Sequence, residues 1–180
     1  MESSTGVRAT PIRWVVMGVS GCGKSTVGQG LASVAGVSFV EGDQFHPAAN
    51  VAKMSAGLAL NDDDRTEWLL ALKGKVDEAR QAGVGIVVSC SSLKRRYRDV
   101  LRAADPALRF AHLSGARELI AERMLARVGH YMPPSLLDSQ FKDLQPLQAD
   151  EAGITLAITA PPTQLVAQIL AAGGRESSQS

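Results

Sequence analysis

The chain has 180 residues, a formal net charge of +1 at pH 7, 45% hydrophobic residues and 21% charged residues. This composition is typical of a globular protein long enough for a substantial core, and its balanced charge excludes the strongly basic signature of a nucleic-acid or membrane-surface binder. No segment approaches the length of a membrane span, and Cys22 and Cys90 have no partner at metal-ligand spacing. We therefore expect a reduced chain in the cytoplasm.

Short apolar runs rich in β-branched residues alternate along the chain with segments of helical periodicity. The predicted strands are 12–17, 37–41, 84–90, 108–113 and 154–158. The predicted helices are 24–34, 64–81, 93–103, 116–127 and 163–172. Nearly continuous apolar strands that alternate with helices predict an α/β fold in three layers, with a five-stranded parallel sheet covered on both faces.

Two longer segments, 46–63 and 128–152, interrupt this alternation. Insertions of such length in a compact α/β chain usually serve as lids or substrate-binding segments, and we expect a lid over about 128–150. The organisation expected is a single domain over 1–180 with a core from about 12 to 172. The ends, 1–10 and 173–180, are expected to be flexible.

The stretch GVSGCGKS, Gly18–Ser25, follows the first predicted strand and precedes a helix, and it fits the phosphate-loop pattern G-x-x-x-x-G-K-[ST]. Glycines let the backbone turn its N–H groups inward, and the helix N-terminus adds a partial positive charge. Lys24 is expected to reach the β- and γ-phosphates, and the Ser25 hydroxyl to ligate Mg²⁺. The predicted nucleotide-binding residues are Gly18, Val19, Ser20, Gly21, Cys22, Gly23, Lys24, Ser25 and Thr26.

The rest of the chain narrows the class of phosphate-loop protein. It has no Asn-Lys-x-Asp of a guanine-specific switch, and the third predicted strand ends in VVSCSS where a mechanical ATPase has an aspartate. A small kinase is the interpretation that remains. Glu41 and Asp43 follow the second predicted strand and therefore lie at the same sheet edge as the loop. Asp43 is suited to accept the proton of an attacking hydroxyl and Glu41 to hold Mg²⁺ through water, while the plain alternative is a polar strand end.

Cations near this edge are candidates for binding an anionic acceptor. Arg65 opposes the dipole of the helix that it begins, which indicates another role, whereas Asp64 and Glu67 fit a helix-capping pattern better than a metal site. Lys94 and Arg98 follow at helical spacing and either contact an anionic substrate or form an ordinary solvated face.

Arg123 and Arg127 lie four residues apart, just before the second insertion. They either belong to a lid that brings guanidinium groups onto the phosphates or cover the edge of the core. His46 and His130 lie in the two insertions and are candidate ligand contacts. Neither has a Cys or His companion that would suggest zinc.

With these residues assembled, the chain from about 12 to 172 resembles the small gluconokinase family. The resemblance is carried, in order, by MGVSGCGKSTVG, GDQFHPAANVAKMSAGLALNDDDRTEWL, CSSLKRRYRDVLR, FAHLSG and RVGHYMPPSLLDSQFKDLQPL. It implies a P-loop NTPase fold like that of nucleoside monophosphate kinases, a mobile lid, and frequently a homodimer. The implied reaction is ATP-dependent phosphorylation of D-gluconate at its terminal hydroxyl, giving 6-phosphogluconate and ADP.

The resemblance also implies residue roles. Asp43 would face the acceptor hydroxyl, Arg127 would serve the transferring phosphate, and the sugar acid would meet Arg65, Lys94 and Arg98. The chain departs from the family at Ala59 and Glu67, where prolines are usual, and at Gln145, where an acid is usual. The alternatives are another small-acid kinase, such as shikimate kinase, and a module that senses ATP or a sugar acid without turnover.

Overall fold

The computed structural model of the chain describes residues 10–127 and 133–174. They form one five-stranded sheet in the order β2–β3–β1–β4–β5, in which every neighbouring pair is parallel. The predicted strands are all confirmed, with ends shifted by one or two residues: β1 (Arg13–Met17), β2 (Ser38–Glu41), β3 (Ile86–Ser89), β4 (Arg109–Ser114) and β5 (Gly153–Ala157).

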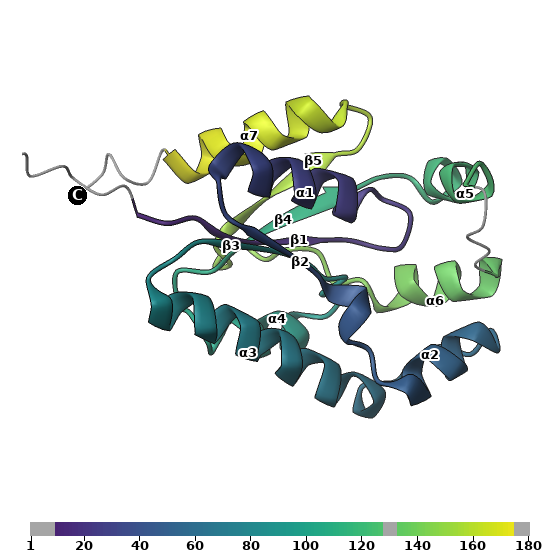
Figure 1. The fold of residues 1–180 in the computed structure, drawn as a ribbon. Coiled ribbons are helices and arrows are strands. Elements are labelled where there is room, and N and C mark those ends of the chain that lie inside the picture. The colour runs from purple at the N-terminus through teal and green to yellow at the C-terminus, as the bar shows by residue number, and fades with distance from the viewer. Residues whose placement is uncertain (1–9, 128–132, 175–180) are drawn as a thin grey trace, which may run out of the picture.

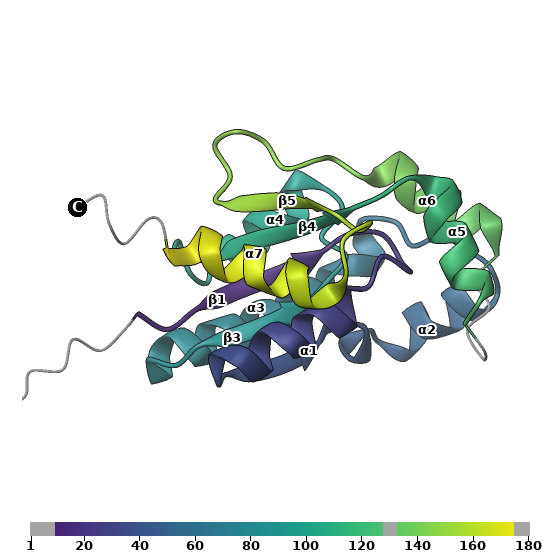
Figure 2. The same ribbon diagram turned by 90° about the horizontal axis from the view of Figure 1, so that it is seen from above.

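Helices cover both faces of this sheet, as the alternation predicts (Figures 1 and 2). One layer contains α1 (Lys24–Ala35) and α7 (Pro162–Gly174), and the other contains α3 (Thr66–Ala82) and α4 (Arg95–Arg102). The apolar central strands β1, β3 and β4 follow from this arrangement, because a strand between two layers of helices must bury both of its faces. In β1, Val16 packs with the cluster under α1 and α7, while Val15 and Met17 pack with the cluster under α3 and α4.

The remaining elements lie at the end of the sheet where the strands finish (Figure 1). They are α5 (Arg117–Leu125), α2 (Ala48–Ser55), α6 (Pro134–Asp143) and the short 3₁₀ helices η1 (Gly42–Phe45) and η2 (Asp63–Arg65). Helices α2 and α6 fall inside the two insertions, for which no element was predicted. The proline that begins α6 is the residue type favoured at a first helical position, so this helix start was readable in the sequence.

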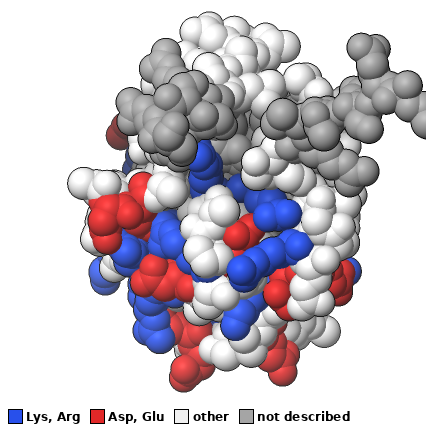
Figure 3. Space-filling model, turned by 90° about the vertical axis from the view of Figure 1, so that its left-hand side faces the viewer, with Lys and Arg blue, Asp and Glu red and all other residues white. Residues whose placement is uncertain are grey.

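The opposite end of the molecule, where the strands begin, has a mixed charge (Figure 3). In the part of that face that the structure describes, lysine and arginine side chains lie among aspartates and glutamates, which agrees with the balanced composition. Across residues 10–127 and 133–174, no helix is both long and apolar enough to cross a lipid bilayer. Cys22 and Cys90 are both buried with free thiols, and burial raises the pKa of Cys90 to about 11.

Candidate active site

The phosphate loop connects β1 to α1 as the motif predicts. Gly23 has a φ of 97°, in the left-handed region that favours glycine, and this residue turns the chain into α1. The loop is fixed to the end of β3 because the Gly18 N–H donates to the Ser91 carbonyl oxygen at 3.2 Å. Lys24 Nζ donates to the Val19 carbonyl oxygen at 3.0 Å, so its ammonium lies back over the loop that it follows.

Hydroxyl and carboxylate oxygens gather beside the start of α1. Glu41, at the end of β2, accepts from Ser25 Oγ at 2.5 Å and from Ser89 Oγ at 2.6 Å. Ser89 also accepts from the Gly42 N–H at 3.2 Å, and Gly42 permits this close approach because a Cβ there would lie 2.0 Å from the Ser89 carbonyl oxygen. Sequence reasoning missed Ser89, although its signal was the serine that stands where mechanical ATPases have an aspartate.

A cavity of about 200 Å³ lies on one side of the phosphate loop. It brings together five of the predicted site residues, which are Ser20 and Lys24 from the loop, Asp43 from η1, His46 from the first insertion and Arg65 from η2. The other residues that line it are Met54, Leu58, Ala59, Leu60, Trp68, Ser91, Leu93, Leu136, Ser139 and Gln140. A carboxylate, two cations and an imidazole around one space suit an anionic polyol, which offers both hydroxyls and a negative charge.

A second cavity, of about 330 Å³, lies on the other side of the same loop. Cys22, Gly23 and Thr26 line it from the loop and α1, and 158–162 line it from beyond β5. Arg123 also lines it and donates from Nη2 to the Ile158 carbonyl oxygen at 2.8 Å. The loop therefore separates two spaces. The first, which we call the acceptor cavity, is bordered by charged and polar side chains suited to the molecule that receives the phosphate. The second is bordered by apolar and backbone groups suited to a nucleobase.

His46 is held between an aromatic ring and an amide. Its ring stacks on the Trp68 indole with centroids 4.2 Å apart, and Trp68 Nε1 donates to the Gly42 carbonyl oxygen at 2.8 Å. Asn50 Nδ2 lies 3.2 Å from His46 Nδ1. Burial lowers the pKa of His46 below its ordinary value, and the charge of Arg65 also lowers it while that of Asp43 raises it. The imidazole is therefore neutral at pH 7.

Arg65 is buried although it is charged. Its side chain donates to the Tyr97 hydroxyl at 2.8 Å and lies 3.5 Å from the Asp143 carboxylate of α6. The Tyr97 hydroxyl in turn donates to Asp62. Hydrogen bonds from Tyr97 and Lys94 lower the pKa of Asp62 to about 2, so this carboxylate is ionised and orients the tyrosine toward the guanidinium.

Lys94 lies in this network and not among the residues that line the cavity. Its Nζ lies 3.0 Å from Asp62 Oδ1, and Arg96 binds the other oxygen of Asp62 at 2.6 Å. The predicted cap formed by Asp64 and Glu67 is wrong. Asn61 and Asp64 instead exchange hydrogen bonds of 2.8 Å, the reciprocal pattern of a capping box, one turn before α3.

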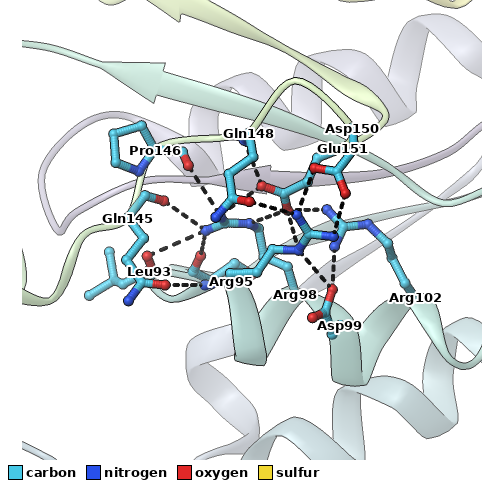
Figure 4. A network of polar contacts seen from close by, with 11 residues as sticks. Leu93, Arg95, Arg98, Asp99, Arg102, Gln145, Pro146, Gln148, Asp150 and Glu151 are labelled. Carbon is cyan, nitrogen blue, oxygen red and sulfur yellow. Dashed lines mark hydrogen bonds and ion pairs between the residues drawn. The ribbon is translucent and has the colours of Figure 1, made fainter.

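The expectation that Arg98 faces the substrate is contradicted by its burial. Its side chain is fully buried and pairs with Glu151, at 2.7 Å from Nε to Oε1 (Figure 4). Its remaining donors reach backbone carbonyl oxygens of Ser92, Leu93, Gln145 and Pro146. Burial alone raises the pKa of Glu151, but the hydrogen bonds from Arg98, the backbone and Arg102 lower it to about 2. Arg98 therefore anchors the segment before β5 to α4.

Gln145, one of the departures from the family, belongs to the same network because its carbonyl oxygen accepts from Arg98. Its Oε1 accepts from the Arg95 N–H at 2.8 Å, which supplies an acceptor to the first turn of α4 (Figure 4). An acidic side chain would make the same bond and add a favourable charge at a helix N-terminus. The glutamine thus keeps the contact without that charge.

Gln140 of α6 is a site residue that sequence reasoning missed. Its Oε1 accepts from the Ser20 N–H at 2.7 Å, and its Nε2 donates to Ser20 Oγ at 3.0 Å. The side chain thus binds a phosphate-loop N–H from within the acceptor cavity. The pattern around Gln140 gave no signal for this contact, because Ser20 and Gln140 lie 120 residues apart.

Arg127 and His130 are also not placed at either cavity. Arg127 follows α5 and is exposed, and in the described part of the chain it lines neither space. His130 lies outside the described residues, as does part of the predicted lid. The roles of both stay predictions, and so does the lid over 128–150.

Comparison with known proteins identifies the family. The model of the shikimate kinase family matches residues 20–170. A gluconokinase of Gluconobacter oxydans (strain 621H) is 42% identical over 169 residues, which cover 94% of this chain and 95% of that one. The chain belongs to the gluconokinase family.

Solved structures agree with this assignment. A gluconokinase from Sinorhizobium meliloti 1021 has a TM-score of 0.84 at 43% identity, over 93% of this chain and 94% of that one. A sugar kinase from Janibacter sp. HTCC2649 has a TM-score of 0.87 at 46% identity, over 91% and 95%. Shikimate kinase from Aquifex aeolicus vf5, at 17% identity and a TM-score of 0.58, shares the fold alone. The predicted P-loop kinase fold is thereby confirmed.

Proposed function

We propose that the protein transfers the γ-phosphoryl group of ATP to the terminal hydroxyl of D-gluconate, giving 6-phospho-D-gluconate and ADP. The observation that carries this proposal is the pair of cavities that flank one phosphate loop, with Lys24 and Asp43 on the acceptor side. The names of the gluconokinase relatives support the choice of gluconate over other acids.

In this proposal Asp43 accepts the proton of the C6 hydroxyl as its oxygen attacks the γ-phosphorus. The new O–P bond forms while the bond to the β–γ bridging oxygen breaks, and ADP leaves with that electron pair. Lys24 leaves the Val19 carbonyl oxygen and moves to the β- and γ-phosphates. Arg65, which Tyr97 and Asp143 hold in place, meets the carboxylate or hydroxyls of the sugar acid.

The residues beside the loop fit Mg²⁺ as well as ATP. Hard oxygen donors of the kind that this ion prefers come from Ser25, Glu41 and Ser89. The two serine hydroxyls both donate hydrogen bonds to the Glu41 carboxylate, so the three side chains lie together. Ser25 would bind the ion directly, and Glu41 would hold its water. When bound, Mg²⁺ neutralises charge on the β- and γ-phosphates.

An assay for ADP release with Mg-ATP tests this function, run with gluconate, shikimate and other small acids in parallel. Gluconate-dependent ADP is the expected result, and shikimate turnover with silent gluconate would reverse the assignment. Asp43→Asn should lower kcat by about 100-fold or more, with ATP affinity nearly unchanged, because it removes only the proton acceptor. Asp77→Asn on the exposed face of α3 is the matched control and should leave kcat unchanged.

The other parts of the proposal extend the family resemblance. Arg127 would contact the transferring phosphate when the lid closes, and His130 would contact the sugar acid. Lys94 would also bind the sugar acid, once its ammonium has left the Asp62 carboxylate. A homodimer in the cytoplasm stays a prediction. The proposed contact of Lys94 with the sugar acid can be tested separately from the other roles. If Lys94 leaves Asp62 to bind gluconate, Lys94→Met should raise the KM for gluconate fourfold or more.

A further inference from the structure

The orientation of the Asn50 amide follows from its two neighbours. Asn50 is buried, with 4% of its surface exposed, and its Nδ2 lies 2.7 Å from the Asp64 carbonyl oxygen. A carbonyl oxygen only accepts hydrogen bonds, so the atom that faces it must be the amide nitrogen. Reversing the amide would place two acceptor oxygens against each other at this distance.

This orientation decides which nitrogen of His46 carries a proton. The same Nδ2 lies 3.2 Å from His46 Nδ1, and an amide nitrogen only donates. His46 Nδ1 must therefore accept, which leaves its proton on Nε2 in the neutral ring. The stack on Trp68, with 17° between the two ring planes, fixes the orientation of this ring, and His46 is among the residues that line the acceptor cavity.

The charged groups around the ring explain why a neutral donor is useful there. Asp43 on η1 and Arg65 on η2 act on His46 in opposite directions, and Lys24 lines the same cavity. Beyond Asn50, Lys53 pairs with Asp64 at 2.6 Å. An imidazolium would pair with Asp43 and compete for the carboxylate that has to take the hydroxyl proton. A neutral ring with Nδ1 already occupied has no free lone pair to act as a base.

We propose that Asn50 is a positioning residue that keeps His46 in the Nε2–H tautomer, so that His46 donates a hydrogen bond to an oxygen of the sugar acid and leaves proton acceptance to Asp43. The tautomer follows from contacts within the chain alone. The identity of the ligand oxygen rests on the proposed function. The geometry thereby assigns donor and base to two neighbouring residues of one cavity.

Nitrogen-15 NMR of the histidine rings tests the tautomer without any substrate. In wild type above pH 7 we expect a protonated Nε2 and an unprotonated Nδ1 at His46, assigned by loss of its signals in His46→Gln. Asn50→Asp places an acceptor at Nδ1 and should convert His46 to the Nδ1–H form or raise its pKa. Asn61→Asp is the matched control, since it adds the same charge to the same insertion without touching His46, and its ring signals should stay as in wild type.

Kinetics give the second readout. Asn50→Asp should raise KM for gluconate about tenfold and make it depend on pH, because the ring then titrates in the assay range. The double variant Asn50→Asp, His46→Gln should lose that pH dependence, since an amide keeps a donor at the Nε2 position at every pH.

The outcomes separate the inference from the function. A proton on Nδ1 in wild type overturns the inference even if gluconate is turned over, and this measurement needs no variant that folds. The Nε2–H form in an enzyme that ignores gluconate supports the inference and overturns the proposed function. Unchanged ring signals in a folded Asn50→Asp protein also overturn the inference.

Discussion

Replacing Glu151 by glutamine tests whether Arg98 is a structural residue. The substitution keeps the shape of the side chain but leaves the fully buried Arg98 guanidinium without its counter-charge. Removal of one partner from a buried ion pair costs about 3–5 kcal/mol. The lowered pKa of Glu151 agrees with this order of magnitude. The difference between its ordinary value of 4.5 and about 2, at 1.36 kcal/mol for each pKa unit, corresponds to about 3 kcal/mol.

Urea unfolding at pH 7 measures this loss directly, and thermal unfolding of a chain of this size should show a fall in Tm of roughly 6–20 °C. Asp150→Asn is the matched control, because the Asp150 carboxylate pairs with Arg95 at 2.8 Å on the exposed side of the same network. That variant should lose less than about 1 kcal/mol, as exposed ion pairs generally do. Equal losses in the two variants would refute the assignment of Arg98 to the core.

The sign of the pH dependence provides a further check. A carboxylate whose pKa is lowered by folding stabilises the folded state above its ordinary value, and this stabilisation disappears as pH falls toward the folded value. The gap in unfolding free energy between wild type and Glu151→Gln should therefore be complete above about pH 4.5 and shrink toward pH 2. A gap that stays constant over that range would show that the lost energy does not come from the charge of Glu151.

Three further substitutions probe the site. Glu41→Gln should raise the Mg²⁺ concentration for half-maximal rate by about tenfold, because a neutral amide holds magnesium-bound water less strongly; an unchanged Mg²⁺ requirement would exclude this role. Gln140→Ala should strengthen ATP binding by about fivefold in calorimetry, since it frees the Ser20 N–H from an internal competitor worth about 1 kcal/mol, and weaker binding would contradict the competition. Tyr97→Phe should raise KM for gluconate by about three- to tenfold with a smaller change in kcat, because Arg65 loses a buried hydrogen-bond partner; a selective loss of kcat would argue against this positioning role.

Local patterns in the sequence were enough to predict the sheet and the phosphate loop. The three central strands, β3, β1 and β4, are almost fully buried because helices cover both faces of the sheet, so their apolar composition is a direct consequence of their place in it. The partners of the side chains on α4 could not be predicted from such local patterns. Helical spacing groups Lys94 with Arg98 but does not reveal that Glu151, 53 residues beyond Arg98, lies against that side of the helix. The contact between Gln140 and Ser20 was hidden for the same reason.

The two cavities divide the proposed chemistry between two parts of the chain. The proposed nucleotide side is built from the loop, α1 and the segment after β5. Much of the acceptor cavity is lined by the first insertion, which supplies His46, Met54 and 58–60. Asp62 of the same insertion binds side chains at the start of α4, namely Lys94, Arg96 and Tyr97. Substrate choice can therefore change with this insertion while the phosphate chemistry stays the same. Ala59, where the family usually has proline, lies in that wall, so backbone freedom there would alter KM for gluconate before it altered the rate of phosphoryl transfer.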